Sequence, residues 1–263
     1  MDEIILYHLG IGAGNPPTDP SELAYTYEGA DLKVIPSFAT IPSIASMLGI
    51  AGLPGVDVNL AMLLHGEHEV ELHRPIPLSA QAKNVSKIAA VYDKGKGAVM
   101  HVETITSDAT GPVFTNRAAL FIRGEGGFGG DSGPQNSTSK PDRDPDLTIE
   151  SPTLPQQALL YRLSGDRNPL HADPAYAALG GFDRPILHGL CSFGVILKAV
   201  VDGAFESDPA PITRYRARFA GVVFPGETIV TSVWKTDEGL FVEASTKDRA
   251  TPVLTNGFVT TTE

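Results

Sequence analysis

Hydrophobic residues recur every three or four positions in two segments of the chain, residues 38–48 and 190–201. This is the spacing of a helix that buries one face. The residues that trace the two apolar faces are Phe38, Ile41, Ala45 and Leu48 in the first segment and Leu190, Phe193, Gly194, Leu197 and Val201 in the second. The pattern therefore predicts one buried helix in each half of the chain.

Four segments with the composition of β-strands follow each predicted helix. They are rich in valine, isoleucine, threonine and aromatic residues, and turn-forming residues separate them. The expected strands are residues 69–72, 83–92, 98–107 and 113–123 in the first half and residues 214–219, 228–234, 240–246 and 253–260 in the second. One helix followed by antiparallel strands, repeated once, indicates an α+β fold that arose by duplication.

The segment 124–155 separates the two halves. Its start is crowded with glycine, and polar residues, prolines and aspartates follow. Such a composition buries too little apolar surface to fold alone, so we expect a flexible linker between a first half of residues 1–123 and a second half of residues 156–263.

The run Gly124-Glu-Gly-Gly-Phe-Gly129 matches the G-x-G-x-x-G pattern of nucleotide-binding turns. That function requires a helix directly after the run, and the following residues open none.

Composition narrows the class of protein. The 263 residues include 20 Lys and Arg against 31 Asp and Glu, which gives a formal charge of −11, and 42% are hydrophobic. This composition is globular, and the acidic balance argues against binding to nucleic acid, which needs many basic residues. A local basic patch is still able to hold an anionic small ligand.

The single cysteine, Cys191, excludes an intramolecular disulfide and is expected to be a small core residue rather than a nucleophile.

Membrane and targeting signals are weak. Residues 34–56 carry no charge and are long enough to span a bilayer, but three prolines interrupt them, so we expect a buried helix with flanking loops. The first three residues, Met1 to Glu3, are acidic, unlike the start of a secretory signal. The last three, Thr261 to Glu263, lack a peroxisomal address. These features predict a cytoplasmic protein that does not enter a membrane.

Three histidines near the first predicted strand resemble metal ligands. His65, His68 and His73 lack the spacing of the H-E-x-x-H motif, and no cysteine accompanies them, so we expect no metal ion. His68 and His73 are expected to be surface residues at a strand edge.

The segment from Tyr161 to His171, Y-R-L-S-G-D-R-N-P-L-H, concentrates the groups that carry chemistry. The turn at Asn168-Pro169 can fold Asp166 back toward His171, so that a carboxylate, an amide and an imidazole meet around one water. A carboxylate and an imidazole can divide proton acceptance and donation when burial tunes their pKa values. On the residues alone an alternative stays open, in which Asp166 and Asn168 only cap turns and His171 fills space.

A second segment reads Arg184-Pro-Ile-Leu-His-Gly-Leu-Cys-Ser-Phe-Gly194 and leads into the predicted helix of the second half. Glycine at a helix entrance permits close approach of a ligand to the backbone. The N–H groups and the positive end of the helix dipole can stabilise a developing oxyanion there. Gly189 is therefore a candidate oxyanion donor.

These motifs resemble a known family, the MaoC-like (R)-specific enoyl-CoA hydratases. Residues 161–171 are similar to its hydratase 2 motif, and residues 184–194 to its helix entrance. Residues 64–77, Tyr92-Asp-Lys-Gly-Lys-Gly97 and the Gly-Gly-Phe-Gly-Gly run at 126–130 resemble the non-catalytic repeat of the long, two-repeat members. The resemblance covers nearly the whole chain.

The resemblance implies a double hotdog fold, in which each repeat wraps an antiparallel sheet around a central helix. It implies syn addition of water to a trans-2-enoyl-CoA, giving a (3R)-3-hydroxyacyl-CoA without a metal or other cofactor. The implied catalytic residues are Asp166 and His171, a water-orienting Asn168 and the oxyanion donor Gly189. The implied acyl-CoA contacts are His65, Gly66, Lys94 and Phe219. The first repeat lacks the D-x-N-P-x-H motif, so one active site per chain is expected, with the first repeat making room for the acyl tail.

Two other functions stay open. One is dehydration of 3-hydroxyacyl thioesters on an acyl-carrier protein in lipid synthesis, and the other is a non-catalytic acyl-CoA-binding subunit. Because hotdog proteins commonly associate through their sheets, we expect a homodimer.

Overall fold

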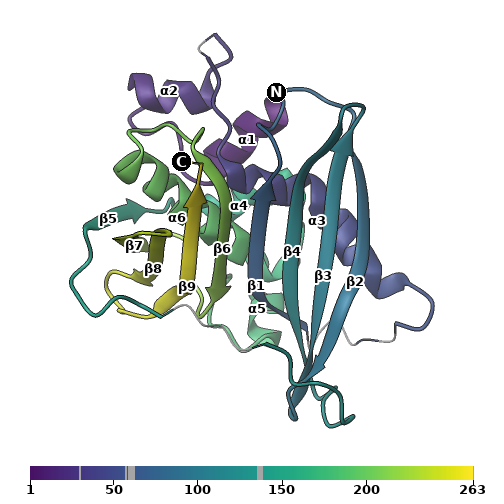
Figure 1. The fold of residues 1–263 in the computed structure, drawn as a ribbon. Coiled ribbons are helices and arrows are strands. Elements are labelled where there is room, and N and C mark those ends of the chain that lie inside the picture. Colours follow the sequence, from purple (N-terminus) through teal and green to yellow (C-terminus); the bar gives the residue numbers. More distant parts are fainter. Residues whose placement is uncertain (30, 57, 59–62, 135–138, 263) are drawn as a thin grey trace.

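The computed structural model describes every residue except 30, 57, 59–62, 135–138 and 263 (Figure 1). Of the described residues, the side chains of residues 48 and 51 are not described. The helices are α1 (Asp2–Gly10), α2 (Pro20–Thr26), α3 (Thr40–Leu48), α4 (Gln157–Tyr161), α5 (Pro174–Leu179) and α6 (Gly189–Ala204), with short 3-10 helices η1 (Pro36–Ala39), η2 (Gly49–Gly52), η4 (Arg162–Ser164) and η5 (Pro169–His171). The strands are β1 (Leu63–Leu72), β2 (Lys83–Asp93), β3 (Gly97–Asp108), β4 (Gly111–Arg123), β5 (Leu147–Pro152), β6 (Ile212–Phe219), β7 (Thr228–Thr236), β8 (Gly239–Thr246) and β9 (Pro252–Thr261).

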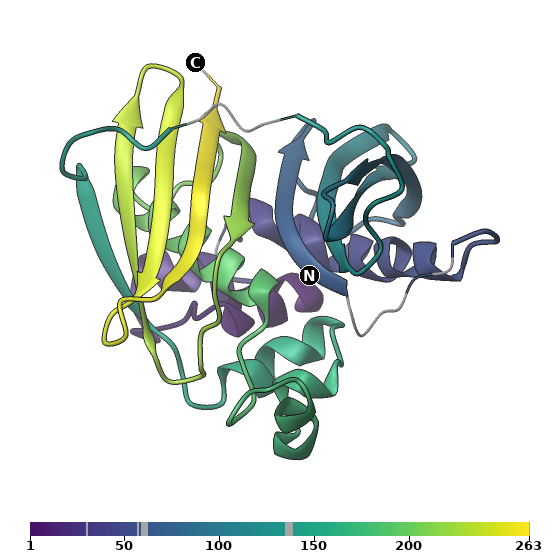
Figure 2. The same ribbon diagram turned by 90° about the horizontal axis from the view of Figure 1, so that it is seen from below.

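All nine strands form one antiparallel sheet in the order β2-β3-β4-β1-β6-β9-β8-β7-β5. The two halves meet where β1 pairs with β6, with Glu67 opposite Arg218 and Glu71 opposite Arg214. Each half contributes its own curved set of strands, and the helices lie on one side of the sheet (Figure 1 and Figure 2). The α+β class predicted from the sequence is confirmed.

The helix α6 is the centre of the second half. Every side chain from Leu190 to Val201 is buried, and its polar side chains find partners both within the helix and in the N-terminal segment, where Cys191 bonds to Gly10 and Lys198 to Glu22. The predicted apolar face is therefore correct, but the tertiary structure covers the opposite face as well. Because segments from both halves pack around it, α6 is fixed more firmly than a helix lying on a sheet surface.

The helix of the first half is shorter than expected, and the side that it buries differs from the predicted one. It begins at Thr40, after the 3-10 turn η1. Its buried side includes Thr40, Ser43 and Met47, whereas Ala45, which we expected on the apolar face, is exposed. The expectation was wrong at this position because Pro36 starts a 3-10 turn, and the tighter winding shifts the helical phase.

The eight predicted strands are all present, most of them one or more residues longer than expected. The sequence missed β5, which falls within the segment 124–155 and pairs with β7 at the edge of the sheet. Its alternating half-buried and exposed positions carry only two apolar residues, Leu147 and Ile149. So short a signal, preceded by prolines and aspartates, is not distinguishable from a polar loop.

The glycine run before β5 also differs from the expected flexible linker. Asp93, at the end of β2, accepts hydrogen bonds from the backbone N–H groups of Gly95, Gly127 and Gly129, each at 2.8 Å. These bonds hold the pKa of the Asp93 carboxyl below its ordinary value. Gly127 and Gly129 have positive φ angles, which glycine adopts without strain. No helix follows the run in the described residues up to 134, in agreement with the exclusion of a nucleotide-binding turn.

The N-terminal helices, which the sequence analysis did not predict, pack against the second half. Tyr7 of α1 contacts the ring of Tyr161, and the carbonyl of Gly10 accepts hydrogen bonds from Gln157 Nε2 at 2.6 Å and from the thiol of Cys191 at 3.3 Å. Cys191 is fully buried, as expected of a core residue, and burial raises the pKa of its thiol. The start of the chain is thus part of the scaffold around α6.

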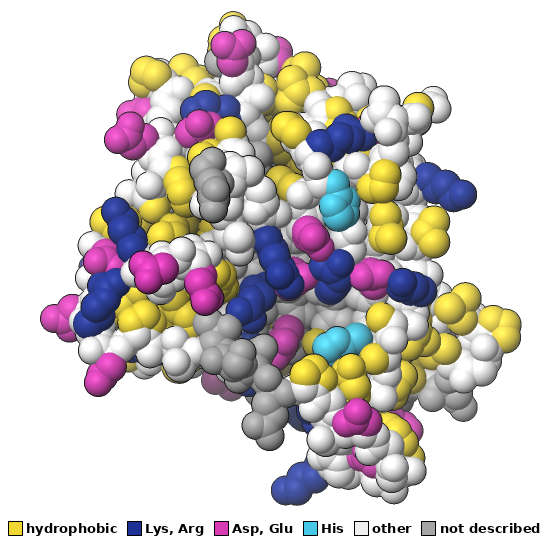
Figure 3. All heavy atoms as spheres, viewed as in Figure 1, with side chains coloured by type: hydrophobic (Ala, Val, Ile, Leu, Met, Phe, Trp, Pro, Cys, Tyr) yellow, Lys and Arg dark blue, Asp and Glu magenta, His cyan; other side chains and the backbone are white. Residues whose placement is uncertain are grey.

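The outer face of the sheet carries a band of charged side chains of both signs (Figure 3). Arg117 of β4 contacts three carboxylates, those of Glu69, Glu71 and Glu103. On β6, Arg214 pairs with Glu69, and Arg218 pairs with Glu67. Such exposed pairs contribute little to stability individually, but as a network they keep the centre of this face polar. Within the described residues, no helix has the length and apolar character required to cross a bilayer.

Candidate active site

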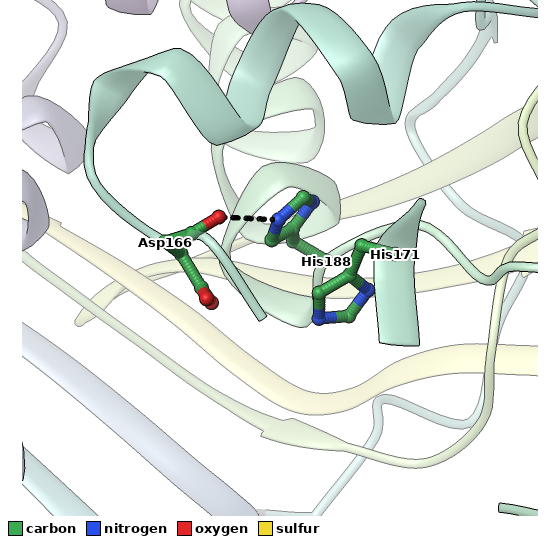
Figure 4. Close-up of side chains that lie close together, drawn as sticks. All are labelled: Asp166, His171 and His188. Carbon is green, nitrogen blue, oxygen red and sulfur yellow. Dashed lines mark hydrogen bonds between the residues drawn. The ribbon is translucent and has the colours of Figure 1, made fainter. Parts of the chain in front are cut away.

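The loop between η4 and α5 brings three titratable side chains together. A carboxylate oxygen of Asp166 and one ring nitrogen each of His171 and His188 lie within 4.8 Å of one another (Figure 4). The sequence predicted the meeting of Asp166 and His171 but not the participation of His188. Asp166 is half-buried, whereas the two imidazoles are buried.

Local turns hold the loop. The Oδ1 atom of Asp166 accepts the backbone N–H of Asn168 at 3.1 Å, and the Oδ1 atom of Asn168 accepts the backbone N–H of Leu170 at 3.0 Å. Asp173 caps α5 by accepting the N–H groups of Ala175 and Tyr176. Asp166 and Asn168 therefore do cap turns. The same turn leaves a carboxylate oxygen of Asp166 within 4.8 Å of a ring nitrogen of each histidine, so turn capping does not keep the carboxylate away from the imidazoles.

Hydrogen bonds define the state of each imidazole. His171 Nδ1 lies 2.9 Å from the carbonyl oxygen of Ile186, so it carries the proton, and Nε2 keeps its lone pair. His188 Nε2 lies 3.1 Å from the carbonyl oxygen of Asp166 and donates to it. The two rings stack at 3.7 Å between centroids, and Tyr161 packs on His188 at 4.9 Å. Both imidazoles are therefore oriented by the backbone of neighbouring segments.

Burial keeps both rings neutral. Desolvation lowers the pKa of His171, although the nearby Asp166 carboxylate acts in the opposite direction. Desolvation, followed by the proximity of His171, lowers the pKa of His188 to about 4. A neutral His171 with a lone pair at Nε2 can accept a proton or a hydrogen bond at neutral pH.

The cluster does not suit a metal ion. The two imidazoles stack with only 26° between their planes, so their in-plane lone pairs run side by side rather than converging on one point. His188 Nε2 is in addition already a donor to a backbone carbonyl. Zinc sites require ligand atoms that converge tetrahedrally. The arrangement fits proton transfer to a substrate better than metal coordination.

The N-terminus of α6 opens beside this cluster. Gly189 is its first residue, it is exposed, and no side chain caps the helix end. A Cβ atom at Gly189 would lie 3.3 Å from the ring of Phe219, so glycine allows this close contact. Uncapped N–H groups and the helix dipole make this position suited to an oxyanion, as predicted.

The expected acyl-CoA contacts lie next to the same entrance. The His65 ring is 4.9 Å from the ring of Phe219, and Gly66 forms the bulge at which the pairing of β1 with β4 shifts. Gly66, Lys94 and Phe219 line one pocket of about 390 Å³, together with Arg218. The structure thus brings together all four expected contact residues. The basic patch expected around Lys94 is modest, because Arg218 pairs with Glu67 in the same pocket.

Sequence comparisons identify the family. Residues 1–124 match the MFE-2 hydratase 2 N-terminal domain, and residues 136–256 match the MaoC like domain. The chain is 45% identical over 253 residues to the enoyl-CoA hydratase ChsH3 of Mycobacterium tuberculosis, covering 94% of this chain and 88% of that protein. It is 40% identical over 268 residues to the peroxisomal enoyl-CoA hydratase 2 of Arabidopsis thaliana, covering 96% and 87%. The chain belongs to the MaoC-like hydratase 2 family.

Solved structures agree with this assignment. A MaoC-like dehydratase from Phytophthora capsici superposes with a TM-score of 0.87 at 35% identity, covering all of this chain and 92% of that one. A Mycobacterium tuberculosis protein described as having a double hotdog fold matches at a TM-score of 0.61 and 13% identity, covering 99% and 91%, which bears on the fold alone. The double hotdog fold expected from the sequence is confirmed for this member of the hydratase 2 family.

In this hydratase 2 member the predicted surface position of His68 is wrong. His68 is 2% exposed and not a surface residue of a strand edge, because β4 and β6 pair on either side of β1. His73, which follows the strand, is exposed as expected. The presence of His188 in the cluster was not predicted, although the residue stands directly before Gly189. A histidine at the N-cap of an uncapped buried helix was the available signal.

Proposed function

We propose that this protein catalyses the reversible syn hydration of trans-2-enoyl-CoA to (3R)-3-hydroxyacyl-CoA in fatty-acid metabolism. The observation that carries the proposal is the cluster of Asp166, His171 and His188 at the open N-terminus of α6. The family assignment and the enoyl-CoA hydratases among its relatives support the substrate class. A non-catalytic binding subunit has no use for this set of groups.

In the proposed mechanism a water molecule is held between the Asp166 carboxylate and Nε2 of His171. The water oxygen bonds to C3 of the enoyl thioester while one of its protons passes to the dyad. A proton is then delivered to C2 from the same face, which makes the addition syn. Asn168 orients the water through its side-chain amide group, and the hydrogen bond that His171 Nδ1–H donates to the carbonyl oxygen of Ile186 keeps the imidazole in the required tautomer.

Negative charge develops on the thioester oxygen as the water adds. The backbone N–H of Gly189 donates to this oxygen, and the dipole of α6 stabilises the charge further. An oxyanion donor of this kind contributes roughly a hundredfold or more to the rate. The Asp166–His171 dyad and Gly189 thus act on the two ends of the same conjugated system.

The two halves divide the remaining work in this proposal. Residues 156–263 carry the chemistry, and residues 1–123 shape the substrate pocket and leave room for the acyl tail. His65, Gly66 and Phe219 contact the acyl-CoA near the thioester, and Lys94 meets the CoA phosphates at the rim. The chain acts as a cytoplasmic homodimer, and a sedimentation mass of a single chain would contradict the dimer.

A hydration assay tests the function. The purified protein is given trans-2-enoyl-CoA substrates of increasing chain length, and the stereochemistry of the product at C3 is determined. We expect a (3R) product; an (S) product or no hydration at any length would contradict the proposal. Comparing kcat/KM for the same acyl group on CoA and on acyl-carrier protein separates a hydratase of CoA thioesters from a dehydratase of lipid synthesis.

A further inference from the structure

A line of buried hydrogen bonds runs through the first half toward the substrate pocket. Asn116 of β4 donates from Nδ2 to the carbonyl oxygen of Ala39 at 3.0 Å. Its Oδ1 lies 2.9 Å from Nε2 of His68, and Nδ1 of His68 lies 3.1 Å from Nε2 of His65. Asn116 and His68 are each 2% exposed, so water does not satisfy these groups in their place.

The hydrogen bond at one end of this line determines the donor and the acceptor of every other hydrogen bond in it. A backbone carbonyl only accepts hydrogen bonds, so the Asn116 amide must present its NH2 group to Ala39 and its oxygen to His68. His68 therefore carries its proton on Nε2 and offers a lone pair at Nδ1. His65 must then donate from Nε2, which leaves Nδ1 as its acceptor nitrogen.

The far end of the line bears on the active site. The His65 ring packs on Phe219, and Phe219 lies against Gly189 at the entrance of α6. His68 also packs edge-on against Phe193 of α6, with 5.5 Å between ring centroids. A displacement of His65 therefore moves the ring that borders the proposed oxyanion donor.

We propose that His68 and Asn116 are positioning residues that fix the tautomer and orientation of His65 against Phe219. This inference rests on the proposed function in so far as His65 and Phe219 contact the acyl-CoA. With its proton on Nε2, neutral His65 accepts but does not donate at Nδ1.

The role is not that of an acid or base. Burial lowers the pKa of His65 to about 3 and that of His68 to about 4, so both rings stay neutral near pH 7. Asn116 does not titrate, and no carboxylate takes part in the hydrogen bonds of this line. The residues act on the substrate site only through geometry.

The tautomers are tested directly and independently of activity. In the full-length protein labelled with 15N-histidine, long-range 1H–15N correlation spectra distinguish protonation at Nε2 from protonation at Nδ1, and the variant His68→Gln assigns the signals. We expect His65 and His68 both to be neutral with the proton on Nε2 at pH 7. Protonation of His68 at Nδ1, or a charged imidazole, would overturn the proposal whatever reaction the protein catalyses.

The functional consequence is tested with a matched set of variants. Glutamine can donate to Asn116 and accept from His65, whereas leucine can do neither. We expect His68→Leu to raise KM for an enoyl-CoA about tenfold, with a smaller effect on kcat, and His68→Gln to stay within about twofold of the wild type. The exposed residue His73 provides the control, and we expect His73→Leu to leave both constants unchanged.

Thermal unfolding of each variant shows whether leucine destabilises the fold, because it leaves the Asn116 oxygen without its donor. Equal losses in the leucine and glutamine variants would reduce His68 to a packing role, and unchanged constants in His68→Leu would overturn the proposal. If the wild type does not hydrate enoyl-CoA, the proposed function fails, while the tautomer measurement still decides whether the hydrogen-bonded line exists.

Discussion

The two halves of the molecule each hold a pair of neighbouring histidines, of which His65 is half-buried and the other three are buried, and the groups beside the pairs differ. In the second half His171 and His188 stack beside the carboxylate of Asp166, at the open end of a helix. In the first half His65 and His68 join Asn116, whose amide ends the line at a backbone carbonyl. Burial lowers the pKa of the histidines in both pairs, so burial alone does not explain how the two pairs differ.

The difference between a carboxylate and an amide decides what each pair can do. Asp166 is able to take up and return a proton, and Nε2 of His171 has a lone pair to share in that transfer. Asn116 has no proton to exchange under ordinary conditions, so the pair beside it only transmits orientation. We therefore propose chemistry for the pair beside the carboxylate and a positioning role for the pair beside the amide.

Removing the carboxylate from the catalytic pair is expected to have the largest effect. In Asp166→Asn the turn-capping oxygen remains, but the proton acceptor is lost, so we expect kcat to fall by about 10²–10⁴ with little change in stability. Steady-state kinetics with an enoyl-CoA and thermal unfolding are the measurements. Undiminished turnover in a folded variant would remove Asp166 from the mechanism.

The positioning pair is expected to affect stability in acid. The pKa of His68 is about 4 in the folded state against 6.5 for a free histidine. Between about pH 6.5 and pH 4, His68 therefore binds a proton in the unfolded chain but not in the folded chain. The contribution of His68 to the free energy of unfolding is fully present above about pH 6.5 and is lost as the pH falls toward 4. This single group accounts for at most about 3 kcal/mol of that fall.

Denaturant unfolding at a series of pH values checks this expectation. The variant His68→Gln does not titrate at this position, so its free energy of unfolding should decline less steeply between pH 6.5 and 4 than that of the wild type. The exposed residue His73 serves as the control, and His73→Gln should follow the wild type. Equal slopes in wild type and His68→Gln would contradict the neutral, buried state of His68.

A smaller effect is expected where the two regions touch, at Gly189. A Cβ atom there would lie 3.3 Å from Phe219, so the ring or the helix end must shift by a few tenths of an ångström. We expect Gly189→Ala to lower kcat about tenfold, since misplacing an oxyanion donor costs less than removing it. The control is Gly49→Ala, at a site where a Cβ meets nothing within 4 Å. Unchanged kcat in Gly189→Ala would show that the donor lies elsewhere.

The smallest effect is expected at the rim of the pocket. Asp93, which precedes Lys94, accepts hydrogen bonds from the backbone N–H groups of Gly95, Gly127 and Gly129. Asp93→Asn keeps the shape but weakens these charge-assisted bonds, so we expect KM for the CoA substrate to rise about threefold with kcat unchanged. A change confined to kcat would argue against a role of this loop in binding CoA.

Local patterns along the chain were enough to predict most of the regular structure. Segments rich in β-branched and aromatic residues identified eight strands, and helical spacing identified the buried face of α6. The loop containing Asp166 and His171 was also predictable, because Asn168-Pro169 forces a turn within six residues. Each of these features depends on residues close together in the sequence.

The tertiary structure alone decided the features that depend on distant segments. Edge strand β5 exists because β7 offers it a partner about eighty residues away. His68 is buried because it lies on the face of β1 that packs against Phe193 of α6, and Asn116 becomes its partner through the pairing of β1 with β4. His188 joins the candidate site because α6 begins against the loop of Asp166. No local pattern encodes such contacts, since they arise only when the whole sheet has closed around the helices.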